Sequence, residues 1–258
     1  MTRLAVGTMA LLLLGLALPA GDAGAAEIKV LSTGNMANIL ADITGPFERA
    51  TGHKLVIETG SVTAIRNRVK SGEAADLTIN ERPELEDLLK EGRIAAGSIV
   101  DIARSPFGVA VRAGAPKPDI STVDAFKRAF LTADSIAVPN PSGGAQDGVY
   151  FMALIERLGM AEQLKPKIKL TQGGDNAAKA VATGEAQIGI AQRRNFFKLN
   201  TVQNLEPLPD IPGIKFLMAG GVPASAREPA AARELARFLS SATTAPIIVG
   251  NGMEAYVQ

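Results

Sequence analysis

Residues Gly60–Asn80 read GSVTAIRNRVKSGEAADLTIN and combine a polar turn, an amphipathic helix and a short strand. Ser61 and Thr63 begin the helical pattern, Gly72 ends it, and Asp76–Ile79 has the composition of a strand. The first backbone N–H groups of a helix have no partner within it, and the helix dipole adds partial positive charge there. A hydroxyl in such a turn caps the helix, or the turn holds an anion without a charged side chain. The stretch therefore predicts an α/β unit whose turn is either a helix cap or part of an anion site.

Strand and helix patterns alternate along the rest of the chain. Ile28–Leu31 has a strand pattern and leads through a polar turn into the helical pattern Met36–Arg49, which Pro46 is expected to kink or restart. Ile99–Ile102 and Phe107–Val111 are two further strand patterns. Alternating strands and helices predict an α/β fold, in which ligands bind at the carboxyl ends of the strands.

The second half of the chain contains more turns of this kind. A helix is expected to begin near Asp147, directly after a loop rich in proline, glycine and serine. Asp175 or Asn176 is expected to cap the helix Ala177–Thr183. These turns add backbone donors at the ends of further strands.

The first 26 residues have the composition of an export signal. Arg3 supplies a short positive region, residues 4–20 are almost entirely apolar, and small residues follow a proline and glycine break. The apolar run, about 17 residues, is at the short limit for a membrane span, and no basic anchor follows it. We expect a signal peptide that is cleaved near Ala25 or Ala26, which places the mature protein in the periplasm.

The composition excludes several classes of function. The net charge is +1, with acidic and basic residues interspersed, so no nucleic-acid partner is expected. The chain has no cysteine, and its one histidine, His53, lies among charged residues and is expected at the surface. No metal site and no cofactor are expected, because clusters of metal ligands are missing. The chain also lacks the G-x-S-x-G, Walker A and H-E-x-x-H motifs, so no enzymatic activity is expected.

Three segments resemble the periplasmic molybdate-binding proteins of ABC transporters. They are V-L-S-T-G-N-M at 30–36, the stretch 60–80, and G-V-Y-F-M-A-L-I-E-R-L-G at 148–159. The part S-G-E-A-A-D-L-T-I at 71–79 is the most specific, because the family has a nearly identical segment there. The resemblance implies a two-lobed type II periplasmic binding fold, in which two doubly wound α/β lobes are joined by two crossover strands and the ligand lies between them.

On that template the chain divides into an export signal and two lobes. The implied boundaries are 1–26 for the signal peptide, 27–106 plus 215–258 for lobe one, and 107–214 for lobe two, with Phe107–Val111 and Lys215–Gly221 as the crossover strands.

The resemblance also implies which residues contact the ligand. Family members hold a tetrahedral oxyanion with neutral donors from both lobes. The matching positions here, with neighbours in the same turns, are Asn35, Ser61, Thr63, Asp147, Asn176 and Gln192.

Several of these positions depart from the family pattern. Asn35 replaces a serine and Gln192 replaces a tyrosine, and both keep a donor. Asp147 replaces a small residue; it either faces the cleft, where it would repel a dianion, or points outward and stabilises the helix start. Arg193 and Arg194 are not part of the family pattern; one of them contacts a carboxylate or phosphate, or both are solvated or bridge the lobes.

These observations predict a monomeric solute-binding protein of an ABC transporter. Its ligand would be a small anion of the molybdate or tungstate kind, and its partner a membrane permease. Alternatives are another anion, such as an organic carboxylate, phosphate or sulfate, or an enzyme on the same fold. A porphobilinogen-polymerising deaminase needs a cysteine that this chain lacks. An effector domain of the LysR type would need a DNA-binding segment where the export signal lies.

Overall fold

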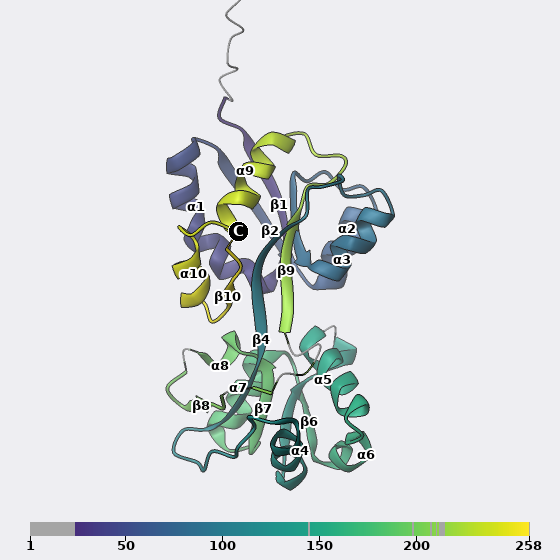
Figure 1. The fold of residues 1–258 in the computed structure, drawn as a ribbon, viewed down its shortest axis with the longest axis vertical. Helices are drawn as coiled ribbons and strands as arrows, with labels where there is room; N and C mark the ends of the chain where they lie inside the picture. Colours follow the sequence, from purple (N-terminus) through teal and green to yellow (C-terminus); the bar gives the residue numbers. More distant parts are fainter. Residues whose placement is uncertain are drawn as a thin grey trace, which may run out of the picture.

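The computed structural model describes residues 24–143, 145–197, 199–206, 208–209, 211 and 215–257. Residues 1–23, which hold most of the predicted signal peptide, lie outside this range. The described chain forms two α/β lobes, one above the other in Figure 1, and strand β4 runs between them. None of the helices in the described part of the chain has both the length and the apolar composition needed to cross a bilayer.

Lobe one is built on a sheet with the strand order β2-β1-β3-β9-β4, in which β1 pairs in parallel with β2 and β3. Buried residues such as Ile39, Ile43 and Phe47 on α1 pack against Val30 of β1. Its strands are β1 (Glu27–Thr33), β2 (Lys54–Gly60), β3 (Leu77–Glu81), β9 (Lys215–Gly221) and β10 (Glu254–Ala255). Its helices are η1 (Gly34–Met36), α1 (Ala37–Thr51), α2 (Val62–Lys70), α3 (Arg82–Lys90), α9 (Pro229–Leu239) and α10 (Ala245–Gly250).

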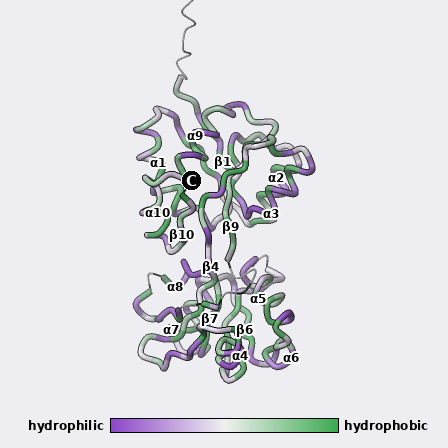
Figure 2. The backbone as a smooth tube through the Cα atoms, viewed as in Figure 1, coloured by the Kyte–Doolittle hydropathy of each residue, from purple (hydrophilic) through white to green (hydrophobic). Residues whose placement is uncertain are grey.

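Lobe two has the strand order β4-β7-β5-β6, with β5 parallel to both β6 and β7. Figure 2 shows hydrophobic residues along the strands inside each lobe and mixed colours along the helices. Its strands are β5 (Ile136–Pro139), β6 (Ile168–Thr171), β7 (Ile188–Gln192) and β8 (Val202–Asn204). Its helices are α4 (Val123–Thr132), η2 (Pro141–Gly143), α5 (Gln146–Arg157), α6 (Ala161–Leu164), η3 (Lys165–Lys167), α7 (Gly174–Thr183) and α8 (Arg194–Phe197).

Strand β4 (Val100–Arg112) belongs to the sheets of both lobes. Residues 100–106 pair with β9 in lobe one, and residues 107–110 pair with β7 in lobe two. The sequence pattern predicted two strands here, and the structure joins them through Ser105 and Pro106, which stay extended because both pair with β9. β4 and β9 carry the chain from one lobe to the other and back, so the predicted two-lobed α/β fold is confirmed.

The structure excludes the restart that was one alternative at Pro46, and it corrects the predicted start of α7. Helix α1 continues through Pro46 without a break to Thr51, although a proline removes one backbone hydrogen bond. Ile43 and Phe47, on either side of Pro46, are both fully buried, so the packing of this face outweighs that loss. Helix α7 begins at Gly174 rather than Ala177, and Gly173 stands at its N-cap with φ 83°, so neither Asp175 nor Asn176 caps it.

The prediction of a surface position for His53 is wrong. The side chain is 3% exposed, and Nδ1 accepts a hydrogen bond from the Ala26 N–H at 3.0 Å. Nε2 lies 3.4 Å from a Glu234 carboxylate oxygen, and the ring centroid is 6.1 Å from that of Phe47. Charged neighbours in the sequence suggested exposure, but the start of β1 and helix α9 cover this turn.

Asp76, in the segment most similar to the molybdate-binding family, holds three parts of lobe one together. One carboxylate oxygen accepts from the Lys29 N–H on β1 at 2.9 Å. The other accepts from the N–H groups of Arg227 and Glu228, at 2.8 and 2.9 Å, just before α9. This residue is 6% exposed, and it ties the returning C-terminal part of the chain to the first strand.

Candidate functional site

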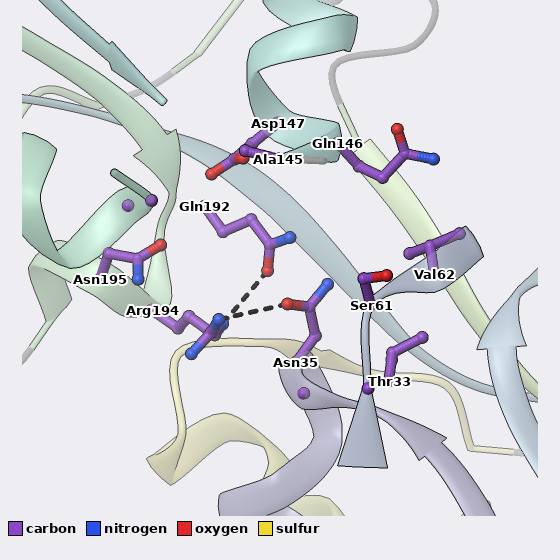
Figure 3. A pocket seen from close by; sticks show the side chains of 14 residues that line it. Thr33, Asn35, Ser61, Val62, Ala145, Gln146, Asp147, Gln192, Arg194 and Asn195 are labelled. Carbon is purple, nitrogen blue, oxygen red and sulfur yellow. Dashed lines mark hydrogen bonds between the residues drawn. The ribbon is translucent and has the colours of Figure 1, made fainter. Parts of the chain in front are cut away.

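A cavity of about 280 Å³ lies between the lobes, and we call it the inter-lobe cavity (Figure 3). Turns that follow β1 and β2 form its wall in lobe one, and the starts of α5, α7 and α8 form its wall in lobe two. The cavity thus lies at the carboxyl ends of strands in both lobes, where ligands bind in open α/β sheets. Its lining residues are Thr33, Gly34, Asn35, Gly60, Ser61, Val62, Ala145, Gln146, Asp147, Gly173, Gly174, Gln192, Arg194 and Asn195.

Parallel pairing of β1 and β2 explains why two distant turns meet at the inter-lobe cavity. Thr33 and Gly60, the last residues of these strands, are direct partners in the register. Ser61 then caps α2, because its hydroxyl accepts the Ala64 N–H at 3.2 Å. Ser61 also lines the cavity, so capping a helix and facing a cavity are combined in this residue.

Besides the short helix α8, three longer helices begin at the inter-lobe cavity. Their first residues, Val62 of α2, Gln146 of α5 and Gly174 of α7, all line it. Free N–H groups and the positive ends of the helix dipoles therefore face the cavity, which favours a negatively charged ligand.

Arg194 brings a full positive charge to the cavity wall. Its Nη2 donates to the Asn35 side-chain oxygen at 3.1 Å, and its Nε donates to the Gln192 side-chain oxygen at 3.2 Å (Figure 3). The bond to Asn35 links the two lobes directly. No ion pair of Arg194 is formed within the described residues. Burial lowers the pKa of this guanidinium, which the charges of Asp175 and Asp147 partly offset, and an arginine stays protonated in proteins.

Asp147 faces the cavity, so of its two predicted orientations the outward one is wrong. The side chain is 8% exposed, and its carboxylate accepts the Gly148 N–H at 3.1 Å. Burial raises the pKa of the Asp147 carboxyl, while hydrogen bonds from N–H groups of Gly148, Asp147 and Gln192, and the charge of Arg194, partly lower it. An acidic and a basic side chain thus share one cavity.

Arg193 and Arg194 have different surroundings although they are adjacent in sequence. The Arg193 Nε lies 2.9 Å from a Glu206 carboxylate oxygen. Its guanidinium lies over the Phe197 ring, 5.3 Å from the ring centroid, which is close enough for a cation–π contact. Arg193 does not line the inter-lobe cavity, whereas Arg194 does.

Four of the six predicted ligand contacts line the inter-lobe cavity: Asn35, Ser61, Asp147 and Gln192. Thr63 and Asn176 do not. Thr63 is exposed on α2. The Asn176 side chain donates to the Gln172 carbonyl at 2.7 Å. Helix α7 starts at Gly174, three residues earlier than predicted, and places glycines at the cavity instead.

Sequence patterns did not select several lining residues as ligand contacts. Thr33 is 1% exposed, and its hydroxyl has no hydrogen-bond partner within the described residues. Asn195 donates to Asp175 at 2.8 Å. The Asn195 amide lies so close to Gly174 that a Cβ there would be 2.4 Å from its oxygen, which explains a glycine at this helix start. The sequence indicates Arg194 together with Arg193, from their position directly after a buried strand, and leaves its contact open.

The lining residues suit an anion better than a metal cation. Within the described residues, no group of three or more histidine or acidic side chains is arranged to hold a metal. The donors are a guanidinium, side-chain amides and helix N–H groups, and the cavity also holds one carboxyl group.

Comparisons with known proteins agree with this architecture. A family model described as bacterial extracellular solute-binding protein matches residues 28–254. The chain is 31% identical to aconitate isomerase of Pseudomonas sp. over 233 residues, which is 88% of this chain and 87% of that protein. It is 30% identical to the molybdate-binding protein ModA of Azotobacter vinelandii over 193 residues, 72% of each chain.

Solved structures extend the agreement to the fold. The periplasmic molybdate-binding protein of Azotobacter vinelandii superposes with a TM-score of 0.66 at 21% identity, covering 88% of this chain and 98% of that one. The predicted resemblance to periplasmic molybdate-binding proteins and the predicted type II periplasmic binding fold are confirmed. The chain belongs to the family of bacterial extracellular solute-binding proteins.

Proposed function

We propose that this protein binds a small organic anion with more than one carboxylate group in the inter-lobe cavity. Arg194 carries this proposal, because it is a cation in the cavity wall and has no acidic partner within the described residues. A guanidinium binds a carboxylate through two parallel hydrogen bonds. The helix starts around it supply neutral donors for further ligand oxygens.

Asp147 argues against a compact dianion such as molybdate. Two negative charges close together in a partly dry cavity repel each other by several kcal/mol. A larger carboxylate ligand can place its charged groups at Arg194 and at the starts of α2 and α7, rather than at the start of α5, where Asp147 lies. One relative, at 31% identity, is named aconitate isomerase, and aconitate is a tricarboxylate. The proposed ligand class therefore differs from the molybdate that the sequence suggested.

In this proposal the protein is exported to the periplasm by its N-terminal signal and works as a monomer with an ABC-transporter permease. The lobes close on the ligand, so that donors from both complete its surroundings, and the closed form docks on the permease. The hydrogen bond between Arg194 and Asn35 supports this, because one ligand contacting both residues would bridge the lobes.

Isothermal titration calorimetry of the mature protein tests the ligand class. The panel contains cis-aconitate, trans-aconitate, citrate and succinate, with molybdate, tungstate, sulfate and phosphate as the oxyanions. We expect saturable binding of at least one tricarboxylate and no heat from the oxyanions. Saturable binding of molybdate or tungstate together with no heat from any carboxylate would overturn the proposal.

A second candidate function is isomerisation of such a ligand. The observation that favours it is Asp147, a carboxyl group facing the cavity beside a cation. Interconversion of the two aconitate isomers can proceed by removal of a proton from the CH2 next to the double bond and addition of a proton at the far carbon, which moves the double bond. Asp147 would carry the proton, and Arg194 would stabilise the negative charge of the intermediate. The predicted absence of enzymatic activity stays a prediction beside this candidate.

Proton NMR of trans-aconitate in D2O tests the second candidate. With wild-type protein we expect the cis isomer to appear and deuterium to enter the ligand, and with Asp147→Asn we expect neither. Asp124→Asn is the matched control, because Asp124 is an exposed acid in the first turn of α4 that does not line the cavity. No conversion by the wild-type protein, at a concentration that saturates it with ligand, would exclude isomerisation.

A further inference from the structure

A second contact joins the lobes outside the inter-lobe cavity. Tyr150 of α5 donates its hydroxyl hydrogen to a carboxylate oxygen of Glu81 at 3.0 Å. Glu81 ends β3 in lobe one, and Tyr150 belongs to lobe two, so the bond breaks when the lobes separate. Neither residue lines the inter-lobe cavity. They border a separate hollow of about 280 Å³, which is also lined by Arg82, Pro83, Glu86, Phe216 and Leu217.

Glu81 has few groups that compensate its charge. It is 2% exposed, and its second carboxylate oxygen has no hydrogen-bond partner within the described residues. No basic side chain in the described range forms an ion pair with it. Among the described residues, Tyr150 is thus the one side chain that donates a hydrogen bond to the Glu81 carboxyl group.

The charged groups around Glu81 come from two helices. On α3, Arg82 is paired with Glu86 and Asp101, and Glu84 faces Glu81 with its negative charge. On α5, Asp147 adds a second negative charge, and Tyr150 is the hydrogen-bond donor.

Nearby Arg66 of α2 does not compensate Glu81, because it pairs with Glu84 at 3.3 Å. Burial therefore raises the pKa of Glu81 to about 7; the Tyr150 hydrogen bond lowers it, and the charges of Glu84 and Asp147 raise it further.

We propose that the Glu81–Tyr150 contact is a proton-dependent latch, in which Glu81 takes up a proton when the lobes close on the ligand. The inference rests on the proposed function, because ligand binding is what closes the lobes. A tyrosine hydroxyl both donates and accepts, so the contact persists when Glu81 is protonated. Ligand binding would then be linked to proton uptake and would respond to the pH of the periplasm.

The sign of the effect follows from the two forms of Glu81. In the open form water reaches the carboxyl group, and its pKa returns towards the ordinary value of 4.5. The closed form has the higher pKa, about 7, so it binds the proton more tightly. Protonation of Glu81 therefore favours closure most strongly below pH 4.5, the pKa of Glu81 in the open form. The stabilisation of the closed form by this proton is lost as the pH rises through about 7.

Calorimetry with trans-aconitate tests the latch through its pH dependence. Between about pH 5.5 and about pH 8.5 the dissociation constant of the wild-type protein is expected to rise about 30-fold more than that of Glu81→Gln. At neutral pH, titrations in buffers of different ionisation enthalpy are expected to show proton uptake for the wild type and less for Glu81→Gln. Comparison with the variant cancels protonation of the ligand itself. The same pH profile for both proteins would overturn the proposal.

Two further variants separate a latch from a merely structural role. Glu86→Gln borders the same hollow and has a partner in Arg82, so it is expected to keep the wild-type pH profile. Tyr150→Phe removes the hydrogen bond that lowers the pKa of Glu81, so its midpoint is expected to move to higher pH. A Tyr150→Phe profile that moves to lower pH would contradict the assigned cause.

Lobe closure can also be followed without any ligand, because the chain has no cysteine. Spin labels at Lys90→Cys in lobe one and Arg128→Cys in lobe two report the inter-lobe distance by pulsed electron paramagnetic resonance. We expect more of the short distance as the pH falls, and less change with Glu81→Gln. Absence of anion binding together with pH-dependent closure would refute the proposed function alone, whereas pH-independent closure would refute the latch.

Discussion

Replacing Arg194 with alanine is expected to weaken tricarboxylate binding by about 50-fold, the largest effect expected from any change in the lining of the inter-lobe cavity. Truncating one member of a desolvated charge pair costs about 2–5 kcal/mol, and Arg194 is half-buried, so the lower part of that range applies. A loss of about 1.4 kcal/mol corresponds to a factor of ten in the dissociation constant. Calorimetry with trans-aconitate measures the change.

The adjacent arginine provides the matched control for this prediction. Arg193→Ala removes the same charge from the next position, but that side chain pairs with Glu206 and does not line the cavity. Its binding constant is expected to stay within about twofold of wild type, since the Arg193 charge is paired with Glu206 outside the cavity and is screened there by solvent. Arg194→Lys keeps the charge but loses the planar fork, so it is expected to bind less tightly than wild type. Equal losses in the two alanine variants would show that net charge, rather than contact with Arg194, controls binding.

Gly148→Ala is expected to destabilise lobe two by about 3 kcal/mol, because a side chain there has no room. A Cβ at this position would lie 1.9 Å from the Pro139 carbonyl oxygen and 2.9 Å from its carbon. Both atoms belong to the backbone at the end of β5, so the helix or the strand must shift. Since 1 kcal/mol corresponds to about 2–4 °C for a chain of this size, the unfolding midpoint should fall by about 6 °C or more.

Gly45→Ala is the control for this substitution, because it also changes a glycine within a helix. Its Cβ would meet only the flexible end of Arg49, at 3.1 Å, so we expect the midpoint to rise slightly or stay unchanged.

Gly148 is also next to Asp147, and a shifted α5 would displace that carboxyl group. We therefore expect ligand binding to weaken in Gly148→Ala even below its unfolding temperature. An unchanged midpoint would show that the approach of α5 to β5 is looser than the structure indicates.

The fold was predictable to a large extent because its signals are local. Hydrophobic periodicity and the polar turn at Ser61 predicted the β2–α2–β3 unit, and the structure has those elements. The resemblance centred on residues 60–80 predicted the two lobes. The exposure expected for His53 was wrong, and the restart considered at Pro46 does not occur, because both depend on buried contacts with segments far away in the sequence.

The inter-lobe cavity was predictable only in part, for the same physical reason. Polar turns at the ends of strands indicate where hydrogen-bond donors lie, and four of the six residues predicted from them line the cavity. Thr33 was missed because its buried, unpartnered hydroxyl is a property of the folded chain. Thr63 and Asn176 were included because sequence position fixes the turn but not which residue of it faces inward.

The sequence alone was enough to establish the α/β class and the presence of donor-rich turns, since these follow from spacing along one strand or helix. The two lobes were implied by the resemblance of its segments to a known family. The orientation of Asp147, the separation of Arg194 from Arg193, and the contact between Glu81 and Tyr150 were decided only by the tertiary structure. Each depends on how α5, α8 and β3 approach one another from distant parts of the chain. Local patterns such as the helix start at Ser61 therefore identify a place for an anion, whereas packing between the lobes determines which charges surround it.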